Sequence, residues 1–180
     1  MLTQFSRTEL LLGKEAMERL AQSRVAVFGV GGVGGYVVEA LVRSGVGAFD
    51  LIDDDKVCLT NLNRQIIATR KTVGKYKAEV MAERIAEINP QADVRIHKCF
   101  FLPENADTFP FEEYDYVVDA MDHVPAKLLL LKQMRKFHTP IITCMGIGNA
   151  WNPSCFRIAD FSKTVNLPFM RKIRQELKIQ

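Results

Sequence analysis

The stretch Arg24-Val-Ala-Val-Phe-Gly-Val-Gly-Gly-Val-Gly-Gly35 decides the fold. Its first half is a short apolar run, which is typical of a buried β-strand. The second half has the spacing Gly-x-Gly-x-x-Gly and leads into helix-like residues 33–44. A glycine loop between a strand and a helix lets a phosphate approach the backbone, where the helix N-terminus offers free N–H groups. We therefore expect a nucleotide at Gly29, Gly31, Gly32 and Gly34 rather than a tight turn without a ligand.

Apolar runs and helix-like segments alternate along the rest of the chain. Strands are predicted at 48–53, 93–99, 114–120 and 140–145, and helices at 75–89 and 126–137. Such alternation favours right-handed parallel crossover units. We predict one α/β domain over residues 1–180, with a doubly wound, mostly parallel sheet of the Rossmann type.

The two ends of the chain predict further elements. Residues 1–22 are expected to form a helical arm, because Ser6 and Glu9 have the spacing of a capping box. Another strand is possible at 156–161, and residues 167–177 have the pattern of an amphipathic basic helix. The chain then stops without a capping residue, which suggests a frayed end or a C-terminally truncated product.

Composition excludes several classes of protein. The formal net charge of +3 does not predict nucleic-acid binding by bulk electrostatics, although it permits a local basic patch. No apolar run reaches the length of a membrane span and no secretory signal is visible, so we expect a cytoplasmic protein. The four cysteines form no Cys-x-x-Cys pair, which argues against a zinc site. We interpret Cys99 and Cys144 as small buried hydrophobes, and leave open whether Cys58 or Cys155 is reactive.

The stretch from Asp53 to Gln65 argues against a dehydrogenase. Asp53 ends the second strand, 19 residues after Gly34, where an acid binds ribose hydroxyls. Arg64 and Lys77 follow, and two cations there could neutralise a departing pyrophosphate. A surface lysine is the alternative for Lys77. Hydride transfer has no obvious use for these cations, whereas triphosphate chemistry does.

Acids near the fourth strand suggest a metal ligand. Asp122 follows the carboxyl end of that strand and could hold Mg²⁺ on the nucleotide phosphates. Asp119 is expected to cap the strand or the next helix, and Asp55 to orient Arg64. We interpret His97 and His138 as structural, while a substrate contact by His123 has only weak support.

With these residues assembled, the sequence resembles the ubiquitin-activating-enzyme-like superfamily, which includes the ThiF, MoeB and HesA proteins. The likeness rests on Arg7, the glycine loop, Asp53-x-Asp55, Asn61-x-x-Arg64-Gln65, Val73-Gly-x-x-Lys77 and Asp122. Within it, the chain is most similar to the tRNA threonylcarbamoyladenosine dehydratases. Three strings carry that likeness: Asp54 to Ile66, Lys77 to Pro90, and Asp160-x-x-Lys163-Thr164 followed by Pro168.

This resemblance implies specific roles for the matched residues. It implies that Asp53 binds ribose, that Arg64 and Lys77 bind the triphosphate, and that Asp122 holds magnesium. It also implies that Arg7 reaches across a homodimer into the partner's ATP site. Asp55, Asn61 and Gln65 join the predicted nucleotide-binding set. The implied cofactors are ATP and Mg²⁺.

The implied reaction adenylates the threonyl carboxylate of a modified adenosine in tRNA and then closes a ring with net loss of water. Members of that branch extend well beyond residue 180, so the resemblance again implies a truncated chain. Two other readings stay open. The chain could adenylate the C-terminus of a ubiquitin-like sulfur-carrier partner, or it could be a nucleotide-binding scaffold without catalysis.

Overall fold

The computed structural model describes residues 3–145, 152–164 and 168–177. Its centre is a five-stranded sheet in which every pair of neighbouring strands is parallel, in the order β3-β2-β1-β4-β5. The predicted doubly wound α/β fold is therefore confirmed. The strands are β1 (Arg24–Phe28), β2 (Ala48–Ile52), β3 (Asp93–His97), β4 (Tyr116–Asp119) and β5 (Ile141–Thr143).

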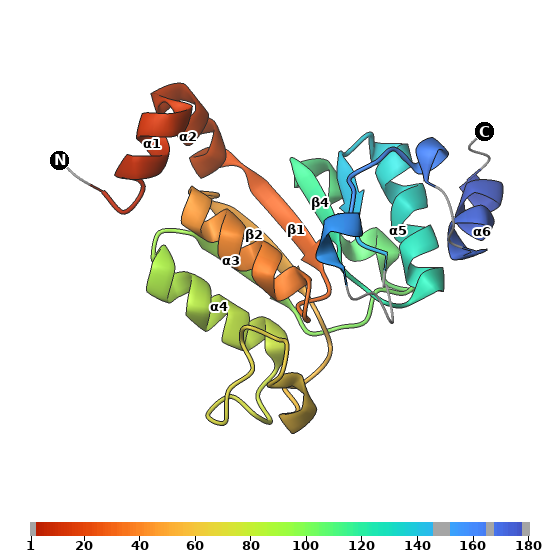
Figure 1. Ribbon diagram of the computed structural model, residues 1–180, viewed down its shortest axis with the longest axis horizontal. Coiled ribbons are helices and arrows are strands. Elements are labelled where there is room, and N and C mark those ends of the chain that lie inside the picture. Colours follow the sequence, from red (N-terminus) through yellow and green to blue (C-terminus); the bar gives the residue numbers. More distant parts are fainter. Residues whose placement is uncertain (1–2, 146–151, 165–167, 178–180) are drawn as a thin grey trace.

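Helices cover both faces of the sheet (Figure 1), which is what short crossover connections require. On one face α3 and α4 pack over β1 and β2, whereas α5 packs beside β5 and contacts α6. The arm formed by α1 and α2 precedes β1. The helices are α1 (Ser6–Leu12), α2 (Lys14–Gln22), α3 (Gly34–Ser44), α4 (Lys77–Ile88), α5 (Val124–Phe137) and α6 (Pro168–Leu177).

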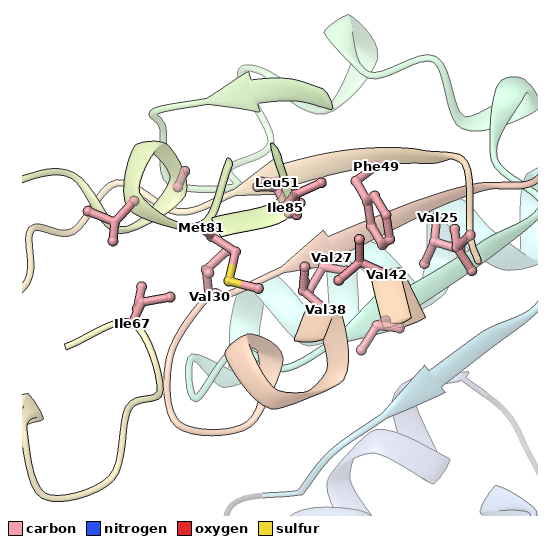
Figure 2. Close-up of a cluster of buried hydrophobic side chains, with 14 of the residues drawn as sticks. Val25, Val27, Val30, Val38, Val42, Phe49, Leu51, Ile67, Met81 and Ile85 are labelled. Atoms are coloured by element: carbon pink, nitrogen blue, oxygen red, sulfur yellow. The ribbon is translucent and has the colours of Figure 1, made fainter. Parts of the chain in front are cut away.

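The core beneath α3 and α4 is mostly aliphatic, with Phe49 of β2 among its members (Figure 2). Val27 of β1 and Leu51 of β2 are fully buried, and Val38 of α3 and Met81 of α4 pack in the same cluster. Burying each such side chain contributes about 1.5–3 kcal/mol. This packing holds the starts of α3 and α4 against the carboxyl ends of β1 and β2.

The opposite core is aromatic. Phe28 of β1 lies with its ring centroid 5.0 Å from that of Phe101 and 5.6 Å from that of Phe109. Leu130 and Met134 of α5 complete the cluster. The loop between β3 and β4, which supplies Phe101 and Phe109, is thereby fixed under the sheet.

A buried carboxylate on β2 interrupts this apolar interior. Asp50 of β2 is fully buried and accepts hydrogen bonds from Arg24 Nη1 (2.7 Å), His97 Nε2 (2.8 Å) and Tyr114 Oη (3.1 Å). Burial raises the pKa of Asp50, but hydrogen bonds, that of His97 foremost, outweigh it and leave the pKa below its ordinary value. Burial and the nearby carboxylate raise the pKa of Tyr114. The structural interpretation of His97 is consistent with this contact.

The strand order places the glycine loop at a crevice. The chain leaves β1 towards β2 on one side and reaches β4 on the other, so the direction of winding reverses between β1 and β4. Ligands of such sheets bind outside the carboxyl ends of the strands at this reversal. The loop after β1 and the turn after β4 are therefore where a nucleotide is expected.

Several local predictions need correction. Residues 156–161 form no strand, because Asn152 and Asp160 accept hydrogen bonds from the N–H groups of Ser154 and Ser162 and begin short 3₁₀ turns instead. Helix α1 begins at Ser6 as predicted, but without a capping box, since the Ser6 hydroxyl accepts from Thr3 N.

Other predictions differ only in detail. His138 ends α5 in the left-handed region, with φ 56°. Cys99 and Cys144 are half-buried rather than buried, and Cys58 is exposed. The side chain of Cys155 lies outside the described part of the chain. Among the helices that are described, none combines the length and apolar character needed to cross a membrane.

Candidate nucleotide-binding site

Two glycines of the loop are required by the protein's own packing. Gly29 has a φ of 90°, and a Cβ on it would lie 2.8 Å from the carbonyl oxygen of Ala120. A Cβ on Gly34 would lie 1.8 Å from the carbonyl oxygen of Gly29. Only glycine fits at either position, because the start of α3 and the turn after β4 both pack against the backbone of the loop.

Gly31 and Gly32 have room for a Cβ atom within the chain. A Cβ on Gly31 or Gly32 would meet nothing nearer than 3.6 Å, and neither residue has a positive φ. Packing within the chain therefore does not demand glycine at these positions. A ligand that approaches the backbone does demand it, which is how glycine loops bind phosphate.

Asp53 lies over the start of this loop. Its Oδ2 accepts a hydrogen bond from Val30 N at 2.7 Å, and its Oδ1 accepts one from Asp55 N at 2.9 Å. Burial raises the pKa of Asp53, and the Val30 N–H and the charge of Lys77 act in the opposite direction. Each carboxylate oxygen keeps a free lone pair, so the side chain can still accept hydrogen bonds from ribose hydroxyls.

Lys77 is buried at the first position of α4, with a side chain only 8% exposed. Its Nζ lies 2.6 Å from Asp55 Oδ2, and its backbone N–H donates to Asp55 O. The surface-lysine alternative is therefore wrong. So is the expectation that Asp55 orients Arg64: Asp55 orients Lys77 instead, because the loop after β2 returns to α4 at that point.

Arg64 and Gln65 lie against the glycine loop from the other side. The aliphatic stem of Arg64 lies beside Gly32, and its Nη1 donates to Thr60 O and Asn63 Oδ1, both at 3.1 Å. The amide of Gln65 is buried beside Gly31. Its Oε1 is the one buried side-chain polar atom without a hydrogen-bond partner in the described part of the chain. A buried acceptor without a partner fits a hydrogen-bond donor from a bound nucleotide.

Asn61 fixes the backbone that carries Arg64 and Gln65. It is buried, its carbonyl oxygen accepts hydrogen bonds from the N–H groups of Arg64 and Gln65, and its Oδ1 accepts from Cys58 N at 3.0 Å. In this geometry Asn61 shapes the loop that carries Arg64 and Gln65.

Sequence reasoning missed a buried ion pair at the end of β4. Asp119 is fully buried, and Lys127 Nζ lies 3.0 Å from its Oδ1. Burial raises the pKa of Asp119, while Lys127 and the Thr143 hydroxyl oppose that rise. Asp119 thus pairs with a lysine, and it also caps the end of β4 as expected, because its Oδ1 accepts a hydrogen bond from Met121 N at 3.2 Å. A lysine within a leucine-rich helix gives no signal of such burial in a single sequence.

Asp122 is exposed just beyond this pair, and forms no ion pair with any described residue. No group of three or more potential metal ligands occurs in the described chain, so the protein offers Asp122 as a single carboxylate. This fits Mg²⁺, which is commonly bound by one or two carboxylates together with water and substrate phosphates. His123, beside it, accepts from Ala126 N and caps α5.

Arg7 is the predicted site residue that the fold keeps apart from the others. It lies exposed on α1, within the arm that precedes β1, whereas the glycine loop follows β1 (Figure 1). The two are at opposite ends of the strand, so Arg7 does not join the site of its own protomer.

These features together define a nucleotide-binding α/β protein. The parallel sheet has a glycine loop where its winding reverses, an acid lies over that loop, and cations lie near both. The chain belongs to the ThiF family, because the sequence model of that family matches residues 5–165. The resemblance seen in the sequence is thereby confirmed.

Individual relatives show which enzymes the chain is similar to. The tRNA threonylcarbamoyladenosine dehydratase of Bacillus subtilis is 47% identical over 99% of this chain and 70% of its own length. The crystal structure of the Escherichia coli enzyme TcdA in complex with ATP is 42% identical, with a TM-score of 0.92 over 98% of this chain and 73% of that one. A sulfur carrier protein adenylyltransferase of Thermus thermophilus is 38% identical over 66% of this chain. The chain spans 63% to 70% of the three bacterial dehydratases it matches.

Proposed function

We propose that this chain binds ATP and adenylates a carboxylate, and that its substrate is threonylcarbamoyladenosine in tRNA. The observation that carries ATP is the arrangement of Asp53, Lys77 and Arg64 around a glycine loop that leaves Gly31 open. The choice of tRNA rests on the identity with dehydratases, which extends over nearly the whole chain. A cytoplasmic location is part of this proposal.

The reaction has two displacement steps. A threonyl carboxylate oxygen attacks the α-phosphorus of ATP, and pyrophosphate leaves with the bonding electrons. The carbamoyl oxygen then attacks the activated carbonyl carbon, a proton leaves the carbamoyl nitrogen, and AMP departs with the former carboxylate oxygen. The modified adenosine has then closed a ring and lost the elements of water.

Each nearby residue has a task in the first step. Asp53 accepts hydrogen bonds from ribose hydroxyls and fixes the nucleoside. Lys77 and Arg64 bind the β- and γ-phosphates and stabilise the charge of the departing pyrophosphate. Asp122 would hold Mg²⁺, which neutralises phosphate charge when bound. Gln65 contacts the nucleotide beside Gly31, and Asn61 positions Gln65.

A homodimer completes the proposal. Arg7 lies away from the site of its own protomer, and the helix that carries it exposes two leucines, Leu10 at 89% and Leu11 at 82%. Docking that helix on a second copy would cover these leucines and bring Arg7 to the other copy's triphosphate. We propose that Arg7 acts on the partner's ATP.

Adenylation of a carrier-protein tail is the second candidate function. It is favoured by the likeness to the Thermus adenylyltransferase, but that likeness covers 66% of this chain against 99% for the Bacillus dehydratase. A partner that receives or supplies sulfur belongs to this candidate alone.

Two measurements test the proposal. ATP with Mg²⁺, but not NAD, should raise the melting temperature, because a ligand that binds only the folded state stabilises it. Stabilisation by NAD alone would refute adenylation. ATP–pyrophosphate exchange should then depend on tRNA bearing threonylcarbamoyladenosine; exchange driven instead by a carrier-protein tail would select the second candidate.

A further inference from the structure

The buried ammonium of Lys127 ties three segments of the fold together. Its Nζ donates to Asp119 Oδ1 at 3.0 Å, to Cys144 O at 2.8 Å and to Thr143 Oγ1 at 3.4 Å. These three acceptors match the three donors of an ammonium group. The residue is 1% exposed, so no water competes for the contacts. Helix α5 is in this way joined to the carboxyl ends of both β4 and β5.

The same network sets the turn that follows β4. Asp119 Oδ1, which Lys127 holds, also accepts a hydrogen bond from Met121 N at 3.2 Å, while its Oδ2 accepts from the Thr143 hydroxyl. Both oxygens of the carboxylate are therefore fixed in direction. Because Met121 is the residue before Asp122, this contact fixes the backbone position from which the exposed side chain of Asp122 extends.

The turn also forms the wall behind the glycine loop. A Cβ on Gly29 would lie 2.8 Å from Ala120 O and 3.1 Å from Met121 N, and one on Gly34 would lie 3.3 Å from Ala120 Cβ. The backbone of Ala120 and Met121 is thus packed directly against the loop. A shift of this turn would move Asp122 relative to the phosphates that the glycine loop binds.

We propose that Lys127 is a positioning residue for the metal–nucleotide complex: through Asp119 it holds the turn of residues 120–122, and so places Asp122 against the phosphates at the glycine loop. The inference rests on the proposed binding of ATP. It assigns Lys127 no contact with ATP, because its three donors are already used within the chain. Its effect should fall on binding that depends on Mg²⁺, since the free nucleotide does not need Asp122.

The test is isothermal titration of the full chain with ATP, first in excess Mg²⁺ and then in EDTA. Lys127→Met keeps the length of the side chain and removes the charge. We expect it to weaken binding of ATP in Mg²⁺ by about 10-fold to 100-fold, the usual effect of losing a residue that orients a metal ligand. Binding in EDTA should change by less than about threefold.

A double variant separates positioning from stability. Asp119→Asn with Lys127→Met removes both charges, so the cost of an unpaired buried carboxylate disappears and the melting temperature should recover in part. If Lys127 positions Asp122, the loss in Mg²⁺ should persist in the double variant. Affinity that returns together with stability would overturn the proposal.

Arg84→Met is the matched control. Arg84 of α4 binds the mostly buried Glu39 of α3 through Nε at 2.7 Å and Nη2 at 2.8 Å, whereas the turn after β4 is held by Lys127 and Asp119. This variant should lose stability without a Mg²⁺-dependent loss of affinity; the same loss in it would overturn the proposal. If the unsubstituted chain binds ATP and Lys127→Met binds it equally well in Mg²⁺, only this inference fails. If the unsubstituted chain binds no ATP, the proposed function fails first.

Discussion

Replacing Lys77 by methionine should separate ATP binding from folding. The Nζ of Lys77 is buried 2.6 Å from Asp55 Oδ2, but the Asp55 side chain is 67% exposed. An ion pair so open to water contributes at most about 1 kcal/mol, and methionine fills the buried channel that the lysine stem leaves. We therefore expect the free energy of unfolding to fall by less than about 1 kcal/mol. In contrast, a hydrogen bond from an ammonium to a phosphate contributes about 1.5–3 kcal/mol to binding. Its loss in Lys77→Met should raise the Kd for ATP by about 10-fold to 100-fold.

The assay is calorimetric titration with ATP and Mg²⁺, paired with urea unfolding of the same preparations. Lys75→Met is the matched control, because Lys75 lies two positions away and binds Glu83 on the surface at 3.2 Å. It removes the same charge from the turn that leads into α4 and should change the Kd by less than about threefold. Equal loss of affinity in both variants would mean that net charge matters and not the place of Lys77. An unchanged Kd for Lys77→Met would refute its assignment to the phosphates.

Three further outcomes are expected. Gly34→Ala should lose ATP binding and about 1–3 kcal/mol of stability, because its Cβ would lie 1.8 Å from Gly29 O, whereas Gly31→Ala should fold normally and bind ATP more weakly; equal stability of the two by urea unfolding would contradict the geometry. Asp50→Asn should cost about 3–5 kcal/mol near neutral pH by removing one partner of a buried charge network. The pKa of Asp50 in the folded state is lowered from 3.8, so its contribution to stability is present above that pH and is lost as the pH falls through the folded-state pKa. The free energy of unfolding of Asp50→Asn should lack this loss in acid, and equal slopes of unfolding free energy against pH in the two proteins would contradict the assignment. Arg7→Ala should reduce pyrophosphate exchange more than ATP affinity if Arg7 acts on the partner's nucleotide, and full activity of a monomer by gel filtration would exclude that role.

The sheet was predictable because its strands are encoded locally. The three inner strands, β1, β2 and β4, are almost entirely buried, so each appears in the sequence as a short, mostly apolar run. The edge strands β3 and β5 are partly exposed. The glycine loop and Asp53 were predictable for a different reason, since their spacing reflects the geometry of one strand-helix-strand unit. Residues 156–161 were mistaken for a strand because they are largely apolar, and nothing local showed that the side chains of Asn152 and Asp160 would begin turns.

The charged interior could not be predicted in the same way. Lys127 and Asp119 are eight positions apart, and their burial together depends on α5 lying beside the ends of β4 and β5. The orientation of Lys77 by Asp55 likewise depends on how a long loop closes, since 22 positions separate the two residues. A sequence shows which side chains carry charge, whereas the partner of each charge is set by tertiary packing.

The balance of charge at the carboxyl edge bears on what else the site needs. The carboxylates there include those of Asp53, Asp55, Asp119 and Asp122, and the cations include those of Arg64, Lys77 and Lys127. Asp119 and Lys127 neutralise one another in the interior, and Asp55 is matched by Lys77. A triphosphate brings more negative charge than Arg64 and the N-terminus of α3 can balance alone. Binding ATP would therefore be helped by further cations, and the Mg²⁺ proposed at Asp122 and the Arg7 proposed to come from a second copy would each meet that electrostatic need.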